Sequence, residues 1–132
     1  MTDLVRLSSG SSFEKLAAYS RAVIDDRYIH ISGTVGTDPD SGAIPDAVTD
    51  QLDNIFRVVE NLLADNGCGL RDVTRTRVYL TDVGHLMDVA EGLRARFSDC
   101  PPANTTLLCG IPAPGAKVEI EFTARLRNSA PE

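Results

Sequence analysis

The residue with the clearest chemical potential is Glu119, which lies in an alternating stretch near the C-terminal end of the chain. Its neighbours Val118 and Ile120 are apolar, and residues 117–127 alternate apolar and polar side chains as a half-buried strand does. The Glu119 carboxylate must therefore point away from the apolar face of this strand. Two interpretations are open: a solvated carboxylate on an exposed face, or a carboxylate that another subunit partly covers. In the second case, desolvation raises the pKa of Glu119 and makes it suitable as a general base for water.

Templates for a nucleophile or a phosphate site match the chain poorly. Ser32 has no GxSxG motif around it, so it lacks the sharp turn that exposes a hydrolase nucleophile. Residues 33–36 contain two glycines but no following Gly-Lys pair, which excludes a phosphate-binding loop. Cys109 could act as a nucleophile with His30 as its base, but the sequence offers no positioned partner. Alternation within the predicted strand instead directs Cys109 toward the core.

Composition narrows the class of protein. The chain has 132 residues, which favours a single domain over residues 1–132. Its 13 basic residues against 19 acidic residues give a net charge of −6, which argues against nucleic-acid and anionic-membrane partners. Three widely spaced cysteines and two histidines offer neither a disulfide framework nor a metal site. Because no apolar run has membrane-spanning length and no basic-then-apolar leader opens the chain, we expect a soluble cytoplasmic protein.

The spacing of polar and apolar residues along the chain predicts the helices and strands that position these residues. Residues 21–24 and 28–32 form a predicted hairpin around a short polar turn, and residues 33–45 form a loop rich in turn residues. Residues 46–64 carry apolar side chains at helical spacing, and the Asn-Gly pair at 66–67 ends this helix.

The second half of the chain continues the alternation of strand and helix. Residues 73–81 are rich in β-branched side chains and predict a strand, after which Asp82 is placed to cap a second amphipathic helix. Two further strands are predicted over residues 104–109 and 117–127, with a turn at 112–115. The order is β-β-α-β-α-β-β, which indicates an α+β domain with two helices on one face of a sheet.

The sheet face away from these helices carries polar and charged side chains. They are Arg75, Arg77, Tyr79, Glu119 and Glu121. Either water or another subunit covers this face, and association is a common way for a domain of this size to complete its burial.

Short segments spread over nearly the whole chain form a specific set, although each is weak alone. They are Tyr19-Ser20-Arg21-Ala22-Val23, Ile31-Ser32-Gly33, Gln51, residues 72–82, Pro102-Ala103, Thr105-Thr106 and Val118-Glu119-Ile120-Glu121. Together, in this order and without large gaps, they resemble the reactive intermediate deaminase family, also called RidA or YjgF-like.

The resemblance implies a chorismate-mutase-like α+β fold that assembles as a homotrimer, with small-molecule clefts between adjacent subunits. It also implies hydrolysis of enamines and imines, such as 2-aminoacrylate, to a keto acid and ammonia without a metal or an organic cofactor. In the best-known branch of the family, an Arg in a Pro-Ala-Arg motif holds the substrate carboxylate and a Glu in the last strand positions water.

Carried over position by position, the resemblance gives cleft-lining or water-positioning roles to Tyr19, Ser32, Gly33 and Glu119. The carboxylate-binding Arg is missing because Asn104 stands in its place, and Thr106 stands where that branch often has Cys. Replacing a bidentate Arg by a single neutral amide costs roughly a few kcal/mol for a carboxylate ligand, or about a hundredfold in affinity. The chain therefore resembles the branches that lack the Arg, in which a standard 2-imino acid is not the expected substrate.

Two alternatives for the missing cation stay open. Asn104 and Thr106 fall on one side of their strand and could hydrogen-bond a neutral or differently charged ligand. Another arginine could instead reach the cleft, unless the candidates are solvated or paired with surface carboxylates. The candidates are Arg21, Arg75, Arg77 and Arg125.

The leading hypothesis is a cofactor-independent hydrolytic deaminase of a small enamine, imine or related nitrogen-containing metabolite. Glu119 would act as general base on water, Tyr19 and Thr106 would orient the ligand, and Asn104 would help to select it. The alternative is a non-catalytic trimer that binds a small ligand or regulates. An endoribonuclease is less favoured, because the net charge of −6 and the 5% aromatic content provide neither a cationic track nor a stacking surface.

Overall fold

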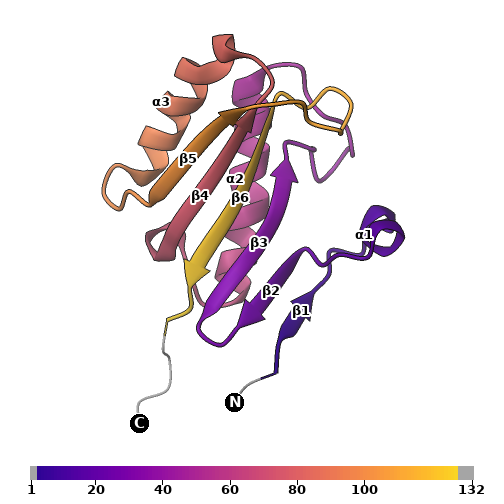
Figure 1. Ribbon diagram of the computed structural model, residues 1–132, viewed down its shortest axis with the longest axis vertical. Helices are drawn as coiled ribbons and strands as arrows, with labels where there is room; N and C mark the ends of the chain where they lie inside the picture. Colours follow the sequence, from indigo (N-terminus) through magenta and orange to yellow (C-terminus); the bar gives the residue numbers. More distant parts are fainter. Residues whose placement is uncertain (1–2, 128–132) are drawn as a thin grey trace.

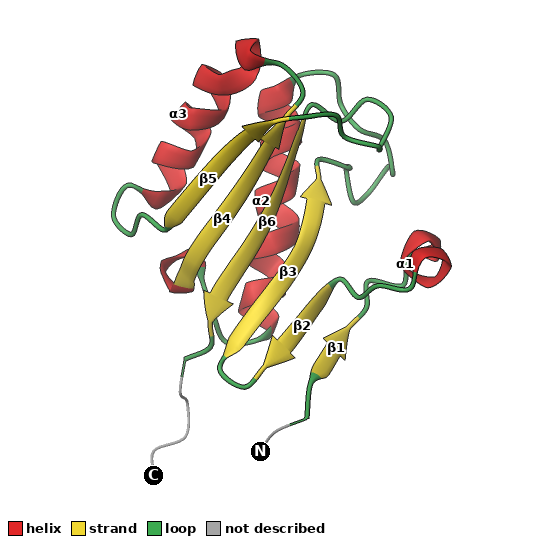
Figure 2. Cartoon of the chain, viewed as in Figure 1, coloured by secondary structure: helices red, strands yellow, loops and turns green. Residues whose placement is uncertain are grey.

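A computed structural model of the chain describes residues 3–127 (Figures 1 and 2). In chain order its strands and longer helices are β1 (Val5–Leu7), α1 (Ser12–Ala17), β2 (Ala22–Asp25), β3 (Tyr28–Val35), α2 (Val48–Asp65), β4 (Val73–Leu80), α3 (Leu86–Phe97), β5 (Ala103–Leu108) and β6 (Val118–Arg125). Two short 3-10 helices, η1 (Leu70–Asp72) and η2 (Val83–His85), precede β4 and α3.

These strands form one sheet in the order β1-β2-β3-β6-β4-β5. The pair β4 and β5 is parallel, and the other neighbouring strands are antiparallel. Helices α2 and α3 lie on the same side of the sheet, as Figure 2 shows. This arrangement confirms the predicted α+β domain with two helices on one face.

The core lies between the sheet and the two long helices. Alternate residues of β6 are buried there, and Phe122 is almost inaccessible to solvent at 1% exposure. Phe56 of α2 contacts Phe122 and Phe97 edge to face, at ring-centroid distances of 5.6 and 5.7 Å. The buried alternate side chains of the strands therefore pack against the apolar face of α2 in one layer. No helix in the described part of the chain is both long and apolar enough to cross a membrane.

Several element boundaries differ from those expected from the sequence. Strand β1 and helix α1 were not predicted, because three residues and six residues are too few to establish a period. After Asp82 the chain first forms η2, with the Asp82 carboxylate accepting from the Gly84 N–H, before α3 begins at Leu86. The prediction that Cys109 faces the core is wrong, because β5 ends at Leu108 and Cys109 is exposed.

Strand β3 is longer than predicted and contains a β-bulge. Its pairing with β6 passes from Ile31 opposite Phe122 to Thr34 opposite Ile120, so β3 has one extra residue at this point. Thr34 is consequently buried on the helix side of the sheet. The predicted loop at 33–45 thus begins as strand, and the bulge changes which side chains of β3 face each side.

The sheet surface opposite α2 and α3, here called the open face, carries the side chains of Arg75, Arg77, Tyr79, Glu119 and Glu121. They lie on cross-strand neighbours, because Arg77 pairs with Glu121 and Tyr79 pairs with Glu119. The Tyr79 hydroxyl donates a hydrogen bond to Glu121 Oε2, and Arg77 Nη1 lies 3.8 Å from Glu121 Oε1. The charged open face predicted from the sequence is therefore present and partly paired within the chain.

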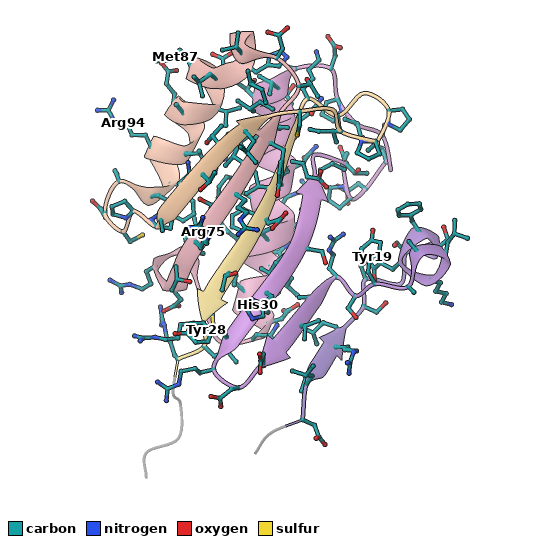
Figure 3. The ribbon with its side chains drawn as sticks, viewed as in Figure 1. Tyr19, Tyr28, His30, Arg75, Met87 and Arg94 are labelled. Carbon is teal, nitrogen blue, oxygen red and sulfur yellow. The ribbon has the colours of Figure 1, made fainter. Side chains whose placement is uncertain are left out.

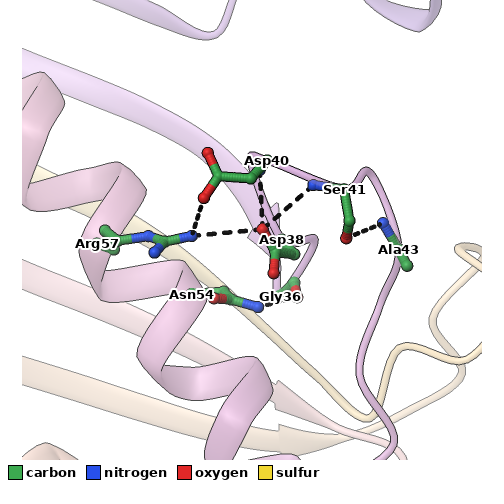
Figure 4. A network of polar contacts seen from close by, with 7 residues as sticks. All are labelled: Gly36, Asp38, Asp40, Ser41, Ala43, Asn54 and Arg57. Carbon is green, nitrogen blue, oxygen red and sulfur yellow. Dashed lines mark hydrogen bonds and ion pairs between the residues drawn. The ribbon is translucent and has the colours of Figure 1, made fainter.

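The loop after β3 is tied to helix α2, as Figure 4 shows. Asn54 Nδ2 donates to the Gly36 carbonyl at 3.0 Å, and Arg57 Nη2 lies 3.5 Å from Asp38 Oδ1 and 3.9 Å from Asp40 Oδ2. The Asp38 carboxylate also accepts from the Asp40 N–H at 2.8 Å, and these hydrogen bonds hold the pKa of Asp38 below its usual value. The loop therefore has a fixed position at the end of β3.

Candidate functional site

The largest described cavity that contains predicted site residues opens at one end of the open face and has a volume of about 530 Å³. It lies where α1, the bulged end of β3, the start of β6 and two loops meet. We call it the Glu119 cleft and define it by Phe13, Tyr19, Arg21, Gly33, Ile111 and Glu119. Tyr19, Gly33 and Glu119 were predicted to share a cleft, and the structure brings these three together.

Glu119 lines the cleft as a partly buried side chain. Burial raises the pKa of its carboxyl above the ordinary value of 4.5, and the nearby Glu121 carboxylate raises it further. The Arg21 guanidinium acts in the opposite direction. Glu119 therefore holds its proton to a higher pH than an exposed glutamate does.

Gly33 provides the space that the Glu119 carboxylate occupies. A Cβ atom at position 33 would lie 2.6 Å from Glu119 Oε2 and 3.0 Å from Glu119 Cδ. Only glycine leaves this approach open without moving the carboxylate. Gly33 thus positions Glu119 directly, whereas the sequence interpretation gave it only a cleft-lining role.

Ser32 does not line the cleft in the structure. Its hydroxyl donates to the Ser20 carbonyl at 2.7 Å, and its N–H donates to the Arg21 carbonyl at 3.0 Å. These bonds tie β3 to the segment that precedes β2. Ser32 therefore holds the Tyr19–Arg21 wall beside Gly33 rather than presenting its hydroxyl to the cavity.

Two aromatic residues and a cation, Phe13, Tyr19 and Arg21, form another part of the cleft wall. The rings of Phe13 and Tyr19 pack edge to face with centroids 6.1 Å apart, and the Arg21 Cζ atom lies 5.9 Å from the centre of the Tyr19 ring. Figure 3 shows Tyr19 close to α1. Phe13 is 60% exposed and Tyr19 is 39% exposed, so both rings are accessible to a ligand.

A buried carboxylate organises the N-terminal part of this wall. Glu14 is buried and accepts hydrogen bonds from the Ser9 N–H at 3.2 Å, from the Ser9 hydroxyl and from the Ser8 hydroxyl at 3.2 Å. Burial alone would raise the pKa of Glu14, but these hydrogen bonds outweigh it and the pKa is lowered. The Ser11 hydroxyl accepts from the Glu14 N–H and caps α1. A Ser-x-x-Glu pattern at 11–14 is a helix-start signal that could have predicted α1.

Gln51 fixes the second loop of the cleft. Its side chain is fully buried, and Nε2 donates to the Pro45 carbonyl at 2.7 Å and to the Gly115 carbonyl at 3.0 Å. Its Oε1 accepts from the Lys117 N–H at 2.8 Å. All three bonds join α2 to flanking loops, one of which leads from Ile111 into β6. Gln51, one of the residues that carry the family resemblance, therefore has a structural role.

Asn104 and Thr106 lie outside the Glu119 cleft of their own chain. They pair with Thr76 and Val78 of β4, so they project to the helix side of the sheet. There they border a cavity of about 370 Å³ beside α3, which Leu86, Leu93 and Phe97 also line. The Thr76 hydroxyl donates to Asn104 Oδ1 at 2.8 Å, and Asn104 Nδ2 donates to the Thr106 hydroxyl at 3.0 Å.

The four candidate arginines occupy different places. Arg75 and Arg77 line a separate open-face cavity of about 300 Å³ together with His30, and Figure 3 shows Arg75 and His30 over this face. Arg75 Nη2 donates to the Thr105 hydroxyl at 3.0 Å. Arg125 is exposed at the end of β6. Of these four candidates, Arg21 is the one that lines the Glu119 cleft.

Comparison with known sequences places the chain in a family. A family model described as Endoribonuclease L-PSP matches residues 9–126. Two mammalian relatives are named 2-iminobutanoate/2-iminopropanoate deaminase. The rat protein is 30% identical over 94% of this chain and 93% of its own length, and the mouse protein is 32% identical over 94% of both.

Solved structures agree with this placement. A Mycobacterium tuberculosis protein described as a member of the highly conserved YjgF/YER057c/UK114 family has a TM-score of 0.83 at 33% identity, covering 93% of this chain and 99% of that chain. RidA from an Antarctic Psychrobacter has a TM-score of 0.78 at 25% identity, covering 91% of this chain and 93% of that chain. The sequence match over residues 9–126, the shared fold and the relatives together show that the chain belongs to the RidA/YjgF/L-PSP family.

Proposed function

We propose that the protein is a cofactor-independent hydrolytic deaminase of a small enamine, imine or related nitrogen-containing metabolite. The observation that carries the proposal is Glu119, a partly buried carboxylate with a raised pKa that lines a cavity of about 530 Å³. The family relatives named 2-iminobutanoate/2-iminopropanoate deaminase support the same reaction class.

In the proposed reaction, water adds to the carbon of a C=N bond. The ionised Glu119 carboxylate accepts a proton from water as the oxygen–carbon bond forms, and this proton passes to the substrate nitrogen. The resulting carbinolamine then loses ammonia: Glu119 takes the hydroxyl proton and passes it to the amine nitrogen, the carbon–nitrogen bond breaks, NH3 leaves, and a carbonyl group remains. A carboxyl group whose pKa is raised is suited to both the accepting and the donating step. Tyr19, at the rim of the cavity, would orient the substrate.

A homotrimer forms part of the proposal, because Asn104 and Thr106 belong to a different cavity from Glu119 in the single chain. We place the α3 side of one subunit against the Glu119 cleft of the next, so that the linked Asn104 and Thr106 side chains face the ligand from across the interface. Strand β5 is at the edge of the sheet, and Leu107 and Leu108 are 47% and 59% exposed, which suits an interface in this region.

The ligand choice follows from the chemistry of position 104. Asn104 offers one neutral amide where a cation would hold a carboxylate, and its Oδ1 is already bonded to Thr76. A substrate group that meets Asn104 is therefore expected to be neutral or a hydrogen-bonding group rather than a carboxylate. A standard 2-imino acid would gain little from this side of the cleft.

The test is release of ammonia and carbonyl product from imines generated in situ by an amino-acid oxidase. Wild type, Glu119→Gln and Asn104→Arg are compared after the mass of each assembly has been measured, with the exposed Glu60→Gln as a matched control. We expect Glu119→Gln to lose about a hundredfold or more of the rate while the mass is unchanged. Full activity of Glu119→Gln would remove this residue from the mechanism. Specific ligand binding without any turnover by wild type would favour the non-catalytic binding protein instead.

A further inference from the structure

Arg21 is the cation of the Glu119 cleft, and its side chain is held in place from one side. Its Nη2 donates to the Gly33 carbonyl at 2.8 Å, and its Cζ lies 5.9 Å from the centre of the Tyr19 ring. Both contacts come from residues that themselves line the cleft. The guanidinium is thus oriented by a backbone carbonyl and an aromatic ring, and within the described residues 3–127 it forms no ion pair with a carboxylate.

The charge of Arg21 is not neutralised by an ion pair in residues 3–127. The ion pairs found there use other basic residues, and none joins Arg21 to Glu119. Arg21 Nε is also buried without a hydrogen-bond partner among the described residues. A partly buried guanidinium with spare donors is costly unless something pairs with it. An anionic group in the cavity that Arg21 lines would offset this cost through its charge, without contacting the enclosed Nε itself.

We propose that Arg21 binds a carboxylate group of the ligand inside the Glu119 cleft, and so supplies the cation that position 104 lacks. The ligand carboxylate would then lie against β2 and β3, on the same subunit as Glu119, instead of against β5. An arginine forms two charge-assisted hydrogen bonds with a carboxylate, which fixes the orientation of the ligand as well as holding it. The reacting carbon would lie between Arg21 and Glu119.

This inference rests on the proposed function only in treating the Glu119 cleft as the ligand site, and its test needs no turnover. The probes are 2-oxobutanoate, which is the keto acid that hydrolysis of 2-iminobutanoate would release, and 2-oxobutanamide, which has the same skeleton without the charge. Dissociation constants for both are measured by calorimetry with the full chain in its native assembly. The matched control is Arg77→Gln, which removes an open-face arginine outside this cleft.

Wild type and Arg77→Gln are expected to bind 2-oxobutanoate at least about tenfold more tightly than 2-oxobutanamide. Arg21→Gln should lose this preference for the charged probe while keeping its affinity for the amide. Equal weakening of both probes by Arg21→Gln would show that Arg21 only positions the cleft, and would overturn the proposal. A wild type that shows no preference, or that binds neither probe, would also overturn it.

A second measurement avoids any variant that fails to fold. The Arg21 Nε–H resonance of the wild-type protein is followed by NMR as each probe is added. Saturating 2-oxobutanoate should shift this resonance, and the amide should not. Binding of the keto acid without a shift would contradict the proposal. If turnover is absent but both measurements give the expected result, the deaminase proposal fails and the carboxylate site stands.

Discussion

The two faces of the sheet use the same strands for opposite purposes. On β6, Ile120 and Phe122 face the helices and are buried almost completely. Between and beside them, Glu119 and Glu121 face the open side, where burial raises the pKa of Glu119 and Tyr79 donates its hydroxyl to Glu121. Residues two positions apart therefore share one environment, and adjacent residues have contrasting environments.

The difference between the two faces indicates that one face mainly stabilises the fold and the other mainly carries the groups available for chemistry. The helix-covered face combines apolar area with close aromatic contacts, which favours a single packed arrangement. The open face retains polar groups that residues 3–127 do not fully satisfy, because the Nε of Arg21 has no hydrogen-bond partner among them. Substitutions on the first face should mainly change stability, and substitutions near Glu119 should mainly change ligand binding or turnover.

The largest expected effect is on the helix-covered face. Phe122→Ala removes a ring that contacts Phe56 at 5.6 Å and is 1% exposed. We expect the free energy of unfolding to fall by about 3 to 5 kcal/mol, because the cavity cannot collapse fully. Urea denaturation measures this change. A loss smaller than about 1 kcal/mol, within the range of surface substitutions, would show that this face is not the main source of stability.

Gln51→Leu tests whether a buried residue that stabilises the fold also affects ligand binding in the cleft. The change leaves the Lys117 N–H and two carbonyl groups without their partner, so we expect a loss of about 3 kcal/mol in unfolding free energy. Because the Gln51 contacts also fix the loop that leads from the cleft into β6, ligand binding should weaken as well. Urea denaturation and binding calorimetry are carried out on the same sample. Lost stability with unchanged ligand binding would show that Gln51 contributes to folding alone.

Gly33→Ala should change the open side with little effect on folding. The new Cβ would displace the Glu119 carboxylate from its position 2.6 Å away, so turnover should fall about tenfold. Gly69→Ala is the matched control, because a Cβ at position 69 would meet no atom within 4 Å. Steady-state rates and urea midpoints are compared for both variants. Unchanged turnover in Gly33→Ala would mean that the position of Glu119 is not critical.

The smallest expected effect is a pH-dependent change in stability. Because the pKa of Glu119 is raised by folding, its contribution to stability is present at low pH and is lost as the pH rises through its folded-state pKa. Glu119→Gln should therefore be more stable than wild type well above pH 4.5 and similar to it below that value. The side chain remains partly exposed, so the difference should be below about 1 kcal/mol. Urea denaturation of wild type and Glu119→Gln, once below pH 4.5 and once well above it, measures the difference in unfolding free energy. A wild type that becomes more stable relative to Glu119→Gln as the pH rises would contradict this prediction.

The sequence predicted the long elements and the orientation of Glu119 well, because both depend on local periods. Alternation in residues 117–127 was enough to direct Glu119 away from the core, and the period of α2 was clear over 18 residues. The resemblance to the RidA family was confirmed by a match over residues 9–126. The family roles of Tyr19, Asn104 and Thr106 remain predictions.

What the sequence did not predict depends on contacts between distant segments. Asn104 and Thr106 share one side of β5 as expected, but only the parallel pairing with β4 shows that this side faces α3. Phe13 and Ile111 enter the Glu119 cleft from segments that have no regular period of their own. The role of Arg21 was also open, since four arginines were equal candidates until their places in the fold were known.

The extra residue at the bulge of β3 makes the number of residues in this strand important for the cleft. Between Ile31 and Thr34 the bulge exchanges the two sides of the strand, which places Thr34 under the helices and Gly33 beside Glu119. Deleting one of the two residues between Ile31 and Thr34 would remove the bulge and leave Thr34 opposite Ile120, so the change would fall on the open side, where Gly33 lies beside Glu119. A length change that a surface loop would tolerate would therefore alter the wall of the cleft beside Glu119, so insertions and deletions in residues 31–35 should impair the cleft more than many substitutions do.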